Sequence, residues 1–187
     1  MQSASKEKII FYLMGIAAVS IGISLGGPFI GMLIHENSHA IACLMFGLPY
    51  SWSLTHVVYV ISPDPLVNII VRLAGGLGQA LVALLLFWYA TKLEKTFSSR
   101  ILFKQLLDEK RSPIRSMFYG FELALLTIAF HGIVTGIWEG FFFESYTENI
   151  HNYFLLVPII LLCGILSFYI IYRRYNSIPD LTEKRGG

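Results

Sequence analysis

Two histidines and a glutamate are grouped in the segment His35 to His39 (HENSH), which lies within an apolar stretch. On a helix, residues four positions apart share a face about one turn apart, so His35 and His39 can reach one metal ion. This HExxH pattern is typical of Zn²⁺ sites in which the adjacent glutamate holds and deprotonates a water. The spacing predicts that both histidines bind Zn²⁺ and that Glu36 is a general base for hydrolysis.

The composition of the chain places this motif in a membrane. Of the 187 residues, 55% are hydrophobic and only 14% are charged, whereas a soluble domain averages about 25% charged residues. The apolar residues form long blocks, which favours an all-α, multi-pass protein of the cell membrane, built as a single domain over residues 1–187. A net charge of +2 is too small to indicate a nucleic-acid partner.

The apolar blocks predict about five transmembrane helices, the second of which carries the histidine pair. The first block resembles the apolar part of a signal peptide, but a turn at Gly26-Gly27-Pro28 favours a retained helix. Residues 51–62 are rich in Val, Tyr, Thr and Ile, which predicts a short extended segment after the HExxH helix. The predicted spans are 9–25, 28–46, 66–90, 117–138 and 153–172, with a basic loop at 91–116 and a polar tail at 173–187.

Catalytic zinc sites usually have a third protein ligand, and two residues of the fourth predicted span are the main candidates for that role. Glu139 stands at the end of the fourth predicted span, and His131 lies deeper in the same span. Eight residues correspond to about 12 Å along a helix, so one ion cannot bind both unless the helix breaks. The histidine pair lies about 10 to 17 Å in from Pro28, which matches the depth of His131 better. We therefore expect His131 as the third ligand, with Glu139 as the alternative.

The HExxH motif within an apolar helix resembles the site-2 protease family, the intramembrane zinc metalloproteases. The resemblance covers about residues 28 to 140 and is specific only at HExxH. It implies that His35 and His39 are zinc ligands and that Glu36 is the general base. The family also has an aspartate in an Asp-Gly motif on a later helix. No such aspartate follows the third span here, and Glu139-Gly140 is the nearest match.

The same family places a motif of glycine and asparagine near the substrate, on a helix that follows HExxH. Gly75-Gly76-Leu77-Gly78-Gln79 is similar to it, with a glutamine where asparagine is usual. The resemblance implies that Gln79 and Gly78 contact the substrate backbone or the oxyanion. Small residues in this cluster also allow helices to approach closely in lipid, so a packing role is the alternative.

The resemblance implies hydrolysis of a peptide bond in or near a transmembrane segment of a protein substrate. A non-catalytic, metal-binding subunit of a membrane complex is the alternative function, because Gln79 and the missing aspartate depart from the family pattern. A third interpretation is a carrier in which His131, Glu122 and Arg72 form a polar path. Glu122 and Arg72 are also expected to pair with each other as a structural contact.

Overall fold

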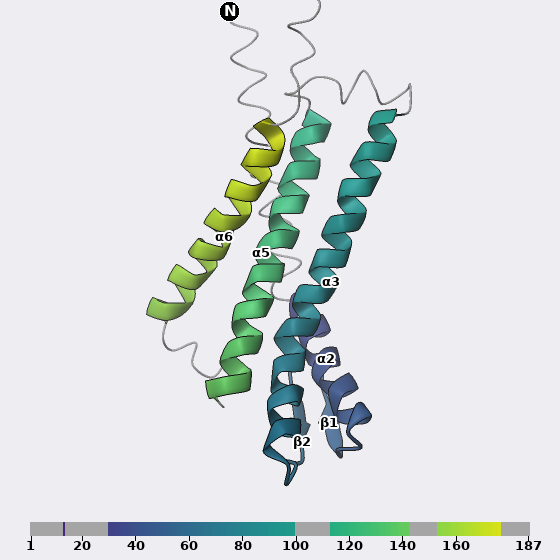
Figure 1. Ribbon diagram of the computed structural model, residues 1–187, viewed down its shortest axis with the longest axis vertical. Helices are drawn as coiled ribbons and strands as arrows, with labels where there is room; N and C mark the ends of the chain where they lie inside the picture. The colour runs from purple at the N-terminus through teal and green to yellow at the C-terminus, as the bar shows by residue number, and fades with distance from the viewer. Residues whose placement is uncertain (1–12, 14–29, 100–112, 143–152, 177–187) are drawn as a thin grey trace, which may run out of the picture.

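The computed structural model describes Leu13 and residues 30–99, 113–142 and 153–176. Within these ranges the chain is mostly helical. Figure 1 shows α3, α5 and α6 side by side, with α5 between the other two, and α2 with a β-hairpin at one end of α3. The elements are α2 (Met32–Met45), β1 (Tyr50–Trp52), β2 (Val57–Tyr59), α3 (Pro65–Ser99), α5 (Pro113–Phe142) and α6 (Tyr153–Asn176).

Helix α2 carries HExxH, as predicted, but it is short. Its 14 residues extend about 21 Å, which is less than the roughly 30 Å of a bilayer core. It ends at Met45, and Gly47, whose φ of 65° reverses the chain, lets Leu48 N–H donate to the Cys43 carbonyl. The prediction that residues 28–46 form a full span is therefore not supported.

The segment after α2 is extended, as expected from its β-branched and aromatic residues. β1 and β2 form an antiparallel pair in which Tyr50 lies opposite Tyr59 and Trp52 lies opposite Val57. Tyr50, Val57 and Tyr59 pack against a small core made by α2 and α3, which contains Cys43 and Val71. The hairpin is thus fixed beside the helix that carries the histidine pair.

Two stretches of the described residues are long and apolar enough to cross a membrane, Pro65–Thr96 and Met117–Phe142. They correspond to the third and fourth predicted spans. The first predicted span, at 9–25, lies outside the described residues apart from Leu13. The fifth is helical, as α6, but it is not one of the two stretches. The described residues therefore support two such helices and not five.

The helices are longer than the predicted spans on both sides of the predicted loop at 91–116, because α3 continues to Ser99 and α5 begins at Pro113. The residues after Ala90 include Lys, Leu and Glu, which are good helix formers, so the appearance of charged residues did not mark the end of the helix. For the same reason α6 continues to Asn176 and contains Arg173 and Arg174. Residues 100–112 lie outside the described ranges.

Glycines bring α3 and α5 into close contact. A Cβ on Gly76 would fall against the backbone of Gly132 and Gly136, and a Cβ on Gly132 would lie 2.9 Å from the backbone nitrogen of Ala80. The two helices are antiparallel, because residues late in α5 meet residues early in α3. The packing role predicted for this glycine cluster is confirmed for Gly76.

A buried ion cluster joins α3, α5 and α6 at the other end of the bundle. Arg174 donates hydrogen bonds to the carboxylates of Glu122 and Glu94, and Glu122 is fully buried. The predicted pair of Glu122 with Arg72 is therefore wrong. Glu122 and Arg72 each lie early in their helix, and because α3 and α5 are antiparallel they are at opposite ends of the bundle. Arg72 instead donates a hydrogen bond to the Tyr59 hydroxyl at 3.3 Å.

Candidate metal centre

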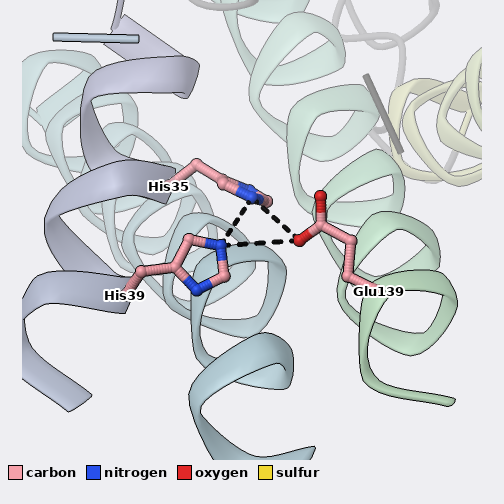
Figure 2. Close-up of side chains that lie close together, drawn as sticks. All are labelled: His35, His39 and Glu139. Atoms are coloured by element: carbon pink, nitrogen blue, oxygen red, sulfur yellow. Dashed lines mark hydrogen bonds and ion pairs between the residues drawn. The ribbon is translucent and has the colours of Figure 1, made fainter. Parts of the chain in front are cut away.

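Two imidazoles from α2 and one carboxylate from α5 converge on a small space. Figure 2 shows the rings of His35 and His39 and the Glu139 side chain pointing toward one another. The Nε2 of His35 lies 3.1 Å from the Nε2 of His39 and 3.0 Å from Oε2 of Glu139, and His39 Nε2 lies 3.5 Å from the same oxygen. All three side chains are mostly buried, with 12–13% of each exposed.

The tautomer of His39 follows from its other ring nitrogen. His39 Nδ1 lies 2.7 Å from the backbone carbonyl oxygen of Val71, which can only accept a hydrogen bond. Nδ1 therefore carries the proton, and in the neutral ring Nε2 presents a lone pair to the cluster. A backbone carbonyl that orients a histidine in this way is a common partner of metal-binding imidazoles.

The three donor atoms match the spacing that Zn²⁺ requires. Ligands at about 2.0–2.1 Å from Zn²⁺ in a tetrahedron stand roughly 3.3 Å apart, and the observed separations are 3.0, 3.1 and 3.5 Å. With both rings neutral and Glu139 ionised, only His35 can place a proton among these three atoms. A divalent cation would satisfy all three lone pairs at once, so the donor set fits Zn²⁺ and leaves a fourth position for water or substrate.

Glu36 stands beside the three donor atoms without joining them. Its carboxylate interacts electrostatically with His35, His39 and Glu139, and it lies near the backbone amide of Val57 at the start of β2. The group of residues that could hold a metal ion contains His35, His39 and Glu139 but not Glu36. The structure thus places Glu36 outside the converging atoms but within electrostatic range of all three residues.

The structure brings Glu139, the alternative third ligand, to the histidine pair and leaves His131, the expected one, outside the converging atoms. His131 lies within electrostatic range of His35 and Glu139 but is outside the group of converging atoms. The depth expected for His35 was counted from Pro28 on the assumption that 28–46 is a full span. His35 is instead the fourth residue of the short helix α2, which packs against the end of the bundle where Glu139 stands.

Gln79 and Gly78 occupy helix contacts. The Gln79 amide is buried and donates to the carbonyl of Ile128 on α5 at 3.4 Å. A Cβ on Gly78 would collide with the side chain of Ser38 on α2. These contacts give both residues a packing role, and they do not support the expectation that Gln79 and Gly78 contact substrate.

Two groups near the centre were not found from the sequence. The Val71 carbonyl has no signature of its own, because every residue carries one. Gly75 lies against both imidazoles, and in the sequence it is one of three glycines with nothing to distinguish it. Gly75 can be singled out only once the structure shows which face of α3 packs against α2.

Comparisons of this chain with protein families, with curated proteins and with solved structures find no match. The geometry of the centre and the chemistry of its residues are therefore the basis for inferring the function.

Proposed function

We propose that this protein is a zinc metalloprotease of the site-2 protease type, which hydrolyses a peptide bond in or near a transmembrane segment of a protein substrate. One observation carries the proposal. Three atoms that can bind a metal ion, two from α2 and one from α5, converge with the edge lengths of a tetrahedral zinc site. A carboxylate, Glu36, stands next to them.

Each residue has a defined role in this reaction. His35, His39 and Glu139 hold the ion, which when bound polarises the scissile carbonyl and makes water acidic near neutral pH. Glu36 takes the proton from the attacking water and returns it to the leaving amine. The Val71 carbonyl keeps His39 in the tautomer that binds metal.

The proposed location is the cell membrane, with α3 and α5 as spans and with α6 and the segment 9–25 as two further spans. Large apolar side chains cover the outer face of α6 and are more than half exposed, as lipid contact would require; they include Leu161, Leu162, Ile165 and Phe168. Lys92 lies over the Trp88 ring at 3.9 Å near the end of α3. Tryptophan and lysine are typical of the level of lipid headgroups.

A replacement of Glu36 by Gln tests the mechanism. Purified protein in detergent with Zn²⁺ is incubated with single-span proteins that carry a Gly-Pro pair in mid-helix, where the peptide bonds are least shielded. We expect wild type to produce fragments, detected by mass spectrometry, and Glu36→Gln to produce none while it keeps its zinc.

Asp64→Asn is the matched control for this carboxylate-to-amide change. Asp64 accepts a hydrogen bond from Leu66 N–H at the start of α3, and asparagine caps a helix equally well. This control should cleave at the wild-type rate. Full cleavage by Glu36→Gln would contradict the proposed role of Glu36.

The alternative is a non-catalytic, metal-binding subunit of a membrane complex. The hydrogen bond of Gln79 to Ile128 favours it, because that amide is then not available to stabilise an oxyanion. The two functions differ in one outcome. A structural subunit would hold stoichiometric zinc, co-purify with partner subunits, and cleave none of the single-span proteins.

A further inference from the structure

Helix α3 passes the candidate metal centre with its backbone, at Gly75. A Cβ built on Gly75 would lie 2.6 Å from the Nε2 of His35 and closer still to the Nε2 of His39. These are the two nitrogens that face Glu139. A methyl group cannot occupy that space while the rings stay where they are, because non-bonded carbon and nitrogen atoms rarely approach within about 3 Å. An alanine at position 75 would therefore push the Nε2 atoms of His35 and His39 away from their present positions.

The same glycine explains how His39 reaches the backbone of α3. In an α-helix, the carbonyl of Val71 accepts a hydrogen bond from the residue four positions later, which is Gly75. A side chain at that position leans back over the preceding turn and covers the carbonyl. Because Gly75 has none, His39 Nδ1 can approach the Val71 oxygen to 2.7 Å. The lack of a side chain at Gly75 thus leaves room for Nε2 of His39 and also lets Nδ1 of His39 reach the Val71 carbonyl.

We propose that Gly75 is a positioning residue for the metal centre, an inference that depends on the proposed zinc site. It keeps the Nε2 atoms of His35 and His39 converged on one point. It also opens the Val71 carbonyl, which fixes the His39 tautomer before any metal arrives. Gly75 thereby sets the affinity of the centre for Zn²⁺ without binding the ion.

The neighbouring glycines have different contacts and so separate this role from simple packing. Gly76 faces α5, where an added Cβ would meet the backbone of Gly132 and Gly136. Gly164 on α6 faces open space, with nothing within 4 Å of an added Cβ. Alanine at these three positions therefore tests the metal centre, the helix contact and the change of residue type separately.

The experiment compares Gly75→Ala, Gly76→Ala and Gly164→Ala as full-length proteins in detergent. Zinc affinity is measured by competition with a chromophoric chelator, and Co²⁺ replaces Zn²⁺ to report coordination through its visible spectrum. We expect Gly75→Ala to lose at least tenfold in zinc affinity, as changes to groups that orient metal ligands do, and to show an altered Co²⁺ spectrum. Its helix content should stay that of wild type.

The controls should behave in opposite ways. Gly164→Ala should bind Zn²⁺ like wild type and be at least as stable, because alanine favours helix by about 1 kcal/mol over glycine. Gly76→Ala should unfold at a lower temperature than wild type, because its methyl group meets backbone on α5. Equal zinc affinity in wild type and Gly75→Ala would overturn the inference. A wild type that binds no zinc would instead refute the proposed function.

A second measurement does not depend on any variant folding. In metal-free wild type labelled with ¹⁵N-histidine, His39 should show a protonated Nδ1 and an unprotonated Nε2 in the nitrogen spectrum. His56, in the exposed hairpin loop, provides an internal reference. An Nε2-protonated His39 would overturn the proposed action of Gly75 through Val71.

Discussion

Replacement of Glu139 by Gln should remove the third ligand while it preserves the shape of the side chain. Glu139 Oε2 supplies one of three converging donor atoms and the only negative charge among them. Four-ligand zinc sites bind with about 10–16 kcal/mol. One ligand therefore accounts for roughly 3–4 kcal/mol, which corresponds to a 10²- to 10³-fold loss of affinity.

His131→Ala is the decisive control for this prediction. His131 lies on the same helix, near the three converging side chains but outside their group. His131→Ala should therefore lose no more than about tenfold in zinc affinity, as expected for a residue that does not bind the metal itself. Both affinities are measured by chelator competition at fixed pH, because protons compete with metal for imidazole. If His131→Ala loses zinc and Glu139→Gln retains it, the assignment of the third ligand is refuted.

Two further variants test the surrounding structure. Arg174→Met should lower the free energy of unfolding by about 3–5 kcal/mol, because it leaves Glu122 and Glu94 buried without the guanidinium that binds both. Glu122→Gln removes a buried charge but keeps the pair of Arg174 with Glu94, so it should cost much less. Equal losses for the two variants in denaturant unfolding would contradict this account. Gln79→Leu should change the free energy of unfolding by about 1 kcal/mol and leave zinc affinity and cleavage near wild type. The reason is that the Gln79 amide bonds only to the Ile128 carbonyl in the contacts described. A loss of cleavage activity of about 10²-fold or more would instead support the oxyanion role of Gln79.

The sequence was sufficient for the local features of this protein. The spacing of His35 and His39 specifies one helix face, and α2 presents both rings on that face. The β-branched residues that follow predicted the extended segment that forms β1 and β2. The apolar blocks at 66–90 and 117–138 predicted α3 and α5. Each of these depends on residues close together in the chain.

The features that were missed depend on how separate helices align. The choice between His131 and Glu139 depended on which turn of α5 lies level with the histidine pair on α2, and a count of residues from Pro28 could not supply this. The pairing of Glu122 with Arg174 instead of Arg72 required the direction of α3 relative to α5. The role of Gly75 required knowledge of which face of α3 meets α2. None of these quantities is encoded in the spacing of a single segment.

The central claim is that the paired imidazoles and Glu139 bind a zinc ion. The most direct test is the metal content of purified wild type and of the double variant His35→Ala/His39→Ala, measured by mass spectrometry after exposure to equimolar Zn²⁺ and removal of loosely bound metal. We predict about one zinc per chain in wild type and none in the double variant. Equal zinc in the two proteins, or no zinc in wild type, would contradict the account.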